Sequence, residues 1–129
     1  MRKKLLITGF ILVFIIVVFG ILWRVFDLST DYNYATAKLD IKDGDVKIIH
    51  VGAHQASPAD KAIETVAARY GFKNIYVEKF TKDQTEKGIQ NYNELIDTYL
   101  VLRNGPDWKA AYQKEVDSIY NAAAGKDNQ

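Results

Sequence analysis

The sequence predicts a small α/β domain of the α+β type behind a single transmembrane helix. Residues 5–23 are uncharged and mostly apolar, residues 46–80 alternate strand, helix and strand patterns, and the pattern after Thr81 is helical almost to the end. We therefore expect a β-α-β unit with few strands, covered by a C-terminal helical hairpin.

Length and composition exclude several classes of protein. The chain has 129 residues, 48% of them hydrophobic and 26% charged, and no cysteine. This length suits one domain and is too short for a complete dinucleotide-binding fold. The lack of cysteine excludes thiol catalysis, disulfide scaffolds and thiolate zinc sites. Positive and negative charges are interspersed without a basic stripe, so we expect no nucleic-acid partner.

The apolar segment Leu5–Trp23 is long enough to cross a membrane. As a helix it spans about 28 Å, close to the roughly 30 Å hydrocarbon core of a bilayer. A cleaved signal peptide is the alternative, but the small-residue triplet at 35–37 lies too far downstream for an ordinary cleavage site. We expect a retained anchor in the cell membrane, with the lipid bilayer as a partner.

The flanking charges predict the orientation of this anchor. Residues 1–4 carry three basic side chains, whereas Arg24 on the other side is soon followed by acidic residues. The positive-inside rule places residues 1–4 in the cytoplasm and the C-terminal domain outside it. We expect residues 24–30 to form a linker, 31–124 the extracytoplasmic domain and 125–129 a disordered tail.

Residues 31–43 fit two structures. As a helix, the segment would be capped by Ser29 or Thr30 and would end at Gly44. As a strand, it would enter a hairpin through the turn Asp43-Gly44. The helix is favoured, because two alanines and the candidate caps precede the turn.

The β-α-β unit has clearer boundaries. Two β-branched, apolar stretches, 46–51 and 74–80, predict strands. Between them, Ser57 is expected to cap a helix that has Pro58 in its first turn and ends at Gly71. This order predicts parallel pairing through a right-handed crossover. Two further helices separated by Asn104-Gly105-Pro106 would form the covering hairpin.

The loop between the first strand and its helix is a candidate ligand site. A helix N-terminus attracts anions, and Gly52 supplies backbone freedom there, although an ordinary turn explains the same residues. The candidate ligand residues are Gly52, His54, Ser57 and Glu78. The two histidines, His50 and His54, lie in a strand and a loop, so we expect no metal site. We expect His50 to be half-buried and His54 exposed.

The segment IIHVGAHQ, followed by YGFKNIYVEKF, resembles the nucleotide-binding start of FkbM-type methyltransferases. The resemblance implies that Gly52 is the turn glycine that cradles S-adenosylmethionine and that Glu78 binds its ribose. His50 replaces an acid of that motif and Ala56 replaces a second glycine. The residues after Phe80 cannot supply the remaining strands of such a sheet, so we expect no cofactor.

Tyrosines offer a second candidate surface. All eight lie in the external domain, and four of them could line a glycan- or peptide-binding surface or form the rim of the core. These four are Tyr92, Tyr99, Tyr112 and Tyr120.

Taken together, these patterns favour a binding or accessory domain, and not an enzyme, that acts on a membrane-proximal protein partner. Two alternatives stay open. One is a small nucleotide- or anion-binding enzyme that uses the Gly52–Ser57 loop and Glu78. The other is a membrane-anchored inhibitor or immunity-type protein.

Overall fold

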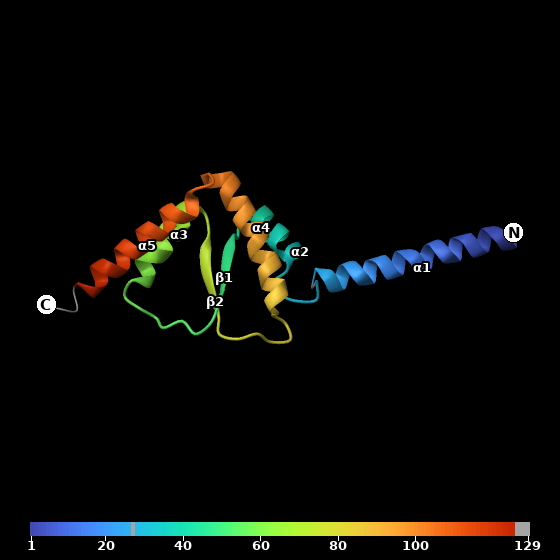
Figure 1. Cartoon of the computed structure of the whole chain (residues 1–129), viewed down its shortest axis with the longest axis horizontal. Coiled ribbons are helices and arrows are strands. Elements are labelled where there is room, and N and C mark those ends of the chain that lie inside the picture. Colours follow the sequence, from blue (N-terminus) through green and yellow to red (C-terminus); the bar gives the residue numbers. More distant parts are fainter. Residues whose placement is uncertain (27, 126–129) are drawn as a thin grey trace.

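The computed structural model describes residues 1–26 and 28–125 (Figure 1). Its helices and strands follow the order helix, helix, strand, helix, strand, helix, helix. They are α1 (Arg2–Val25), α2 (Tyr34–Asp43), β1 (Lys47–Val51), α3 (Asp60–Tyr70), β2 (Lys73–Val77), α4 (Glu86–Asn104) and α5 (Trp108–Ala124).

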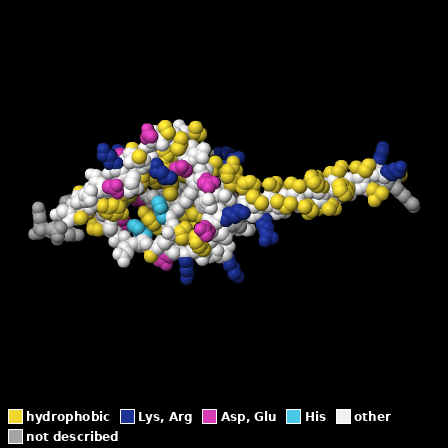
Figure 2. Space-filling model, in the orientation of Figure 1, with side chains coloured by type: hydrophobic (Ala, Val, Ile, Leu, Met, Phe, Trp, Pro, Cys, Tyr) yellow, Lys and Arg dark blue, Asp and Glu magenta, His cyan; other side chains and the backbone are white. Residues whose placement is uncertain are grey.

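Helix α1 stands apart from the rest of the molecule (Figure 1). Its segment Lys3–Val25 is long and apolar enough to cross a membrane, and its apolar side chains from Leu5 to Val25 are exposed in the isolated chain. Figure 2 shows the hydrophobic side chains along its whole length, with basic side chains near each end. The helix therefore includes the expected span and continues past it at both ends.

The two strands form a parallel pair, as expected for a β-α-β unit. Their register runs from Lys47 opposite Lys73 to Val51 opposite Val77, and α3 connects them. The second strand was expected to reach Phe80 but ends at Val77. Its partner strand ends at Val51, where Gly52 turns the chain with φ +130° and donates its N–H to the Val77 carbonyl at 2.8 Å.

The ambiguous segment before β1 is helix α2, and the hairpin alternative is wrong. The cap is Asn33, and not Ser29 or Thr30: Asn33 Oδ1 accepts the N–H groups of Ala35 at 2.8 Å and Thr36 at 3.0 Å. The Thr36 hydroxyl in turn accepts the Asn33 N–H at 2.9 Å, which completes a reciprocal capping box.

The expected C-terminal hairpin does not cover one face of the sheet. Instead α4 packs against α2 and β1, while α5 packs against α3, so the two helices diverge on opposite sides of the strands (Figure 1). Gly105, with φ +96°, and Pro106 redirect the chain between them. The physical reason is that parallel strands have two faces to bury, and the crossover helix α3 leaves one of them open.

The core lies mainly between α4 and the sheet. Tyr92, Ile96 and Leu100 of α4 are fully buried. Asn93 of the same helix closes the outer edge of β1, because its side-chain amide accepts the Ile49 N–H at 2.9 Å and donates to the Ile49 carbonyl at 2.8 Å. An edge strand closed in this way offers fewer free groups for pairing with another chain.

The expected linker 24–30 is partly built into the domain. Thr30 and Asn33 are buried, and the Asp31 N–H donates to the Asp83 carbonyl at 2.7 Å. Thr30 therefore belongs to the packed domain, one residue before its expected start. Of the expected tail 125–129, Gly125 directly follows α5 and residues 126–129 lie outside the described residues.

Candidate functional site

Both histidines lie on one face of the domain (Figure 2). His50 of β1 and Tyr76 of β2 are register partners, and their rings stack with centroids 5.1 Å apart. His54, in the loop after β1, stacks on the same Tyr76 ring at 3.8 Å with an interplanar angle of 11°. Tyr76 itself is 43% exposed. His50 was expected to be half-buried but is exposed, as is His54.

Beside this stack lies a shallow cleft of about 260 Å³ between the sheet and α3. Its lining combines aromatic, acidic and amide side chains with one apolar residue: His54, Asp60, Ile63, Glu64, Asn74 and Tyr76. The cleft runs along β2 from Asn74 to Tyr76 and reaches His54 in the loop after β1.

Asp60 fixes the loop at one end of the cleft. Its carboxylate accepts the Ser57 N–H at 3.0 Å, the Ser57 hydroxyl at 3.1 Å and His54 Nε2 at 3.0 Å. The Ser57 N–H bond, followed by the His54 bond, holds the pKa of Asp60 below its ordinary value. The Ser57 hydroxyl also accepts the Ala59 N–H at 3.2 Å. The prediction that Ser57 caps α3 is nevertheless wrong: the N-cap is Ala59, without a side-chain cap bond, because residues 58–59 form a turn and regular helix begins only at Asp60.

Asn74 forms the hydrogen bonds on the other side of the cleft. Its amide nitrogen donates to Glu64 of α3 at 2.9 Å and to the Tyr112 hydroxyl of α5 at 3.3 Å. With that orientation, its amide oxygen accepts from His50 Nε2 at 2.8 Å, so this imidazole nitrogen carries the proton. One side chain of β2 thus joins β1, α3 and α5.

The predicted ligand residues do not form one site. Gly52, His54 and Ser57 share the loop after β1, and His54 and Ser57 meet at Asp60. Glu78 is exposed in the bend after β2 and is not among the residues that line the cleft. Tyr76, which sequence reasoning did not select, is the ring on which both histidines stack.

The four tyrosines predicted to line a binding surface do not lie on one surface. Tyr92 is fully buried and donates its hydroxyl to Asp40, so it does not line a surface. Tyr99 is half-buried beside the groove between α2 and α4. Tyr112 and the exposed Tyr120 lie on α5, on the cleft side of the molecule. Partial burial is the largest cause that raises the pKa of Tyr76, and the nearby hydroxyl groups of Tyr120 and Tyr112 raise it further.

These contacts limit the chemistry of the cleft. Within residues 1–26 and 28–125, no group of three His, Asp or Glu side chains could hold a metal ion. The Ser57 hydroxyl bonds to Asp60 and the Ala59 N–H, and His54 bonds to Asp60, so the contacts do not form a serine–histidine pair. The arrangement fits recognition by stacked rings and carboxylates.

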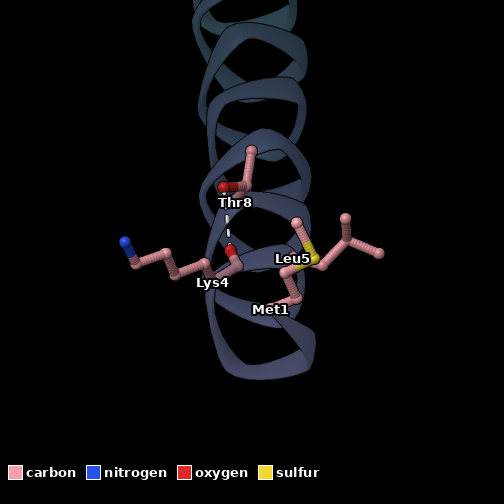
Figure 3. Close-up of a pocket in the computed structure, with 4 residues that line it drawn as sticks. All are labelled: Met1, Lys4, Leu5 and Thr8. Carbon is pink, nitrogen blue, oxygen red and sulfur yellow. Dashed lines mark hydrogen bonds between the residues drawn. The ribbon is translucent and has the colours of Figure 1, made fainter.

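A larger hollow lies at the start of α1 (Figure 3). It is lined by Met1, Lys4, Leu5 and Thr8, all from the first turns of this helix, and the Thr8 hydroxyl donates to the Lys4 carbonyl at 2.9 Å. A hollow beside a lone helix has no second wall. We do not regard it as a ligand site.

Comparison of the chain with protein families, curated proteins and solved structures gives no match. The likeness of the β-α-β segment to FkbM-type methyltransferases therefore stays a resemblance between short segments.

Proposed function

We propose that this chain is a single-pass, membrane-anchored accessory protein whose extracytoplasmic domain binds a protein partner through the face around Tyr76. The observation that carries the proposal is the exposed stack of His50 and His54 on Tyr76 beside the acidic cleft. We call this face, made by His50, His54, Asp60, Glu64 and Tyr76, the histidine–tyrosine face.

Several properties of this face suit a protein interface. Aromatic rings with polar tips are enriched in protein interfaces and dominate their binding energy. The rings are already ordered, since Asp60 holds His54 and Asn74 holds His50, so binding would cost little conformational entropy. The carboxylates of Asp60 and Glu64 and the ring of Tyr76 at the cleft favour a partner that presents basic side chains.

The position of the anchor supports a partner in or near the same membrane. Only eight residues, 26–33, separate α1 from α2, and several of them are packed into the domain. If α1 spans the bilayer with its basic N-terminus in the cytoplasm, the domain stays close to the outer membrane surface. Partners within reach are the external parts of other membrane proteins.

Affinity purification from membranes tests this proposal. The full chain would be extracted in mild detergent after cross-linking in cells, as wild type and as the Tyr76→Ala, His54→Ala and Lys114→Ala variants. Lys114 is exposed on α5 and serves as the matched control. We expect a protein that is recovered with wild type and Lys114→Ala and lost with Tyr76→Ala and His54→Ala.

Two results would contradict the proposal. One is recovery of the same proteins with all four chains, which would show that the histidine–tyrosine face does not take part. The other is turnover of a small substrate that Glu78→Ala abolishes without loss of folding, which would favour the enzyme alternative.

A further inference from the structure

The outer face of the α2/α4 layer exposes apolar side chains to solvent. Leu39 of α2 is 56% exposed and Leu102 of α4 is 82% exposed. A groove of about 370 Å³ runs between the two helices, with Ile41, Leu95 and Tyr99 among the residues that line it. Leu102 lines this groove, and Leu39 lies beside it, next to Lys38 in α2. Exposed apolar side chains gathered at a groove are typical of a site that another surface covers.

This face lies on the side of the domain from which α1 departs. Phe26 directly follows α1, and its ring lies 5.8 Å from the ring of Tyr34, the first residue of α2. Figure 1 shows α2 and α4 as the layer nearest α1, with α3 and α5 on the far side of the strands. The bond from Asp31 to Asp83 holds the connecting segment against the domain. With α1 across a bilayer, the α2/α4 layer is the one turned toward the lipid.

The charges on this face match a lipid headgroup region. Lys38 and Lys42 lie one turn apart on α2, and both line the groove. Lys38 Nζ lies 5.3 Å from the centre of the ring of Tyr34, the first residue of α2. Lysines beside exposed leucines are typical of helices that lie at a membrane interface, since their stems cover apolar surface while their ammonium groups reach phosphates.

We propose that the face formed by Lys38, Leu39, Lys42, Leu95 and Leu102 docks on the headgroup region of the bilayer that α1 spans. We call it the lipid-facing surface. The proposal rests on the insertion of α1, which is part of the proposed function. In this arrangement the lysines bind lipid phosphates, the leucines enter the boundary between headgroups and acyl chains, and α3 and α5 lie away from the lipid.

Fluorescence quenching on the full chain tests this docking. Because the chain has no cysteine, a single substitution places one fluorophore at Leu39→Cys or Leu102→Cys. The protein would be reconstituted into vesicles of phosphatidylcholine and phosphatidylglycerol that contain a lipid with a nitroxide on its headgroup. We expect several-fold stronger quenching at both positions than at Lys114→Cys, on the exposed side of α5. Quenching equal to that control would overturn the proposal.

Two further measurements separate the possible outcomes. A fluorophore at Val17→Cys, quenched by a nitroxide on the lipid acyl chain, reports whether α1 is inserted. If the Val17 probe is not quenched, α1 is not inserted, and both the proposed anchor and the docking are wrong. If the Val17 probe is quenched but the probes at Leu39 and Leu102 are not, only the docking is wrong. In vesicles without nitroxide lipid, the Leu102 probe could instead be quenched by a nitroxide on a second copy of the chain. That result would show that another copy of the chain, and not the bilayer, covers this face.

A charge-reversed chain tests the role of the lysines. Combining Lys38→Glu with Lys42→Glu is expected to reduce lipid quenching at Leu102 several-fold, because phosphate groups would then repel the groove. Unchanged quenching would overturn the assignment of these lysines to lipid phosphates.

Discussion

At Gly88, the first turn of α4 meets the segment that leads from α1 into α2. A Cβ atom built at this position would lie 2.6 Å from the Thr30 hydroxyl and closer still to the Tyr32 carbonyl. The glycine therefore permits the close packing of residues 30–32 against α4, which fixes the entry of the chain into the domain.

We predict that Gly88→Ala lowers the free energy of unfolding by about 1–3 kcal/mol, because a backbone carbonyl cannot move aside at little cost. Gly125→Ala is the matched control, because a Cβ atom built at Gly125 would lie 3.6 Å from the Asn121 carbonyl oxygen, an ordinary contact. This substitution should change the free energy of unfolding by no more than about 0.5 kcal/mol. Chemical denaturation followed by circular dichroism measures both. Equal effects would show that residues 30–32 do not pack as closely as described.

Asp60 contributes to the pH dependence of the folding stability. Its pKa is lowered from the ordinary 3.8 by the Ser57 N–H and then by His54. A carboxyl with a lower pKa in the folded state stabilises the fold above its unfolded pKa, and this stabilisation is lost as the pH falls through the folded pKa.

We therefore expect the denaturation midpoint to fall as the pH drops below about 4, and we expect Asp60→Asn to remove part of that fall. Glu78→Gln, an exposed carboxyl in the bend after β2, is the control and should keep the wild-type pH dependence. If Asp60→Asn follows the wild-type curve between neutral pH and pH about 3, the bonds at Asp60 contribute nothing to folding.

Sequence reasoning selected His54 and Ser57 but missed Tyr76, and the physical reason is distance along the chain. The bonds that Ser57 makes involve its near neighbours Ala59 and Asp60, which a local pattern contains. The stacking of His50 on Tyr76 depends on the strand register, and the stacking of His54 depends on how the loop folds back. The parallel order of the strands was predicted, but the register was not.

At the scale of elements, the beginning of α2 shows which local signals decide a boundary. Four residues before α2 are of types that cap helices, namely Ser29, Thr30, Asp31 and Asn33. Asn33 is the cap because both its side chain and its own N–H take part in the capping box. Thr30 instead donates its hydroxyl to the Tyr32 carbonyl at 2.9 Å. The stop at Gly44, with φ +74°, was predicted from the sequence because only the local backbone decides it.

We predict that Asn33→Ala destabilises the domain by about 0.5–2 kcal/mol, the usual range for a lost N-cap. Ser29→Ala, at an exposed position that also fits a cap pattern, should change the stability by less than about 0.5 kcal/mol. Thermal unfolding of the two variants beside wild type measures the difference. A larger loss in Ser29→Ala would contradict the assignment of the cap.

The divergence of α4 and α5 could not be predicted from their apolar stripes. Each stripe indicates a buried side, but not which surface buries it. The outcome depends on competition among the two faces of the sheet, α2 and α3. Contacts between Phe72 and the rings of Trp108 and Tyr112 direct α5 to the side of α3. Asn93 directs α4 to the edge of β1.

At the scale of the whole molecule, the two proposed surfaces lie on different sides of the domain. The side near α1 carries the lipid-facing surface, and the histidine–tyrosine face adjoins the far layer of α3 and α5 (Figures 1 and 2). The apolar segment itself was predicted from composition alone, since length and hydropathy need no tertiary information. The positions of the two surfaces required the packed structure.

The most direct test of the account labels the Lys114→Cys variant of the full chain with a membrane-impermeant maleimide in intact cells. The natural chain has no cysteine, so any label reports this one position. We predict full labelling of full-length protein in the membrane fraction, with no increase after the cells are made permeable. Labelling only after permeabilisation, or a shortened labelled chain in the medium, would contradict an anchored domain on the outer side of the membrane.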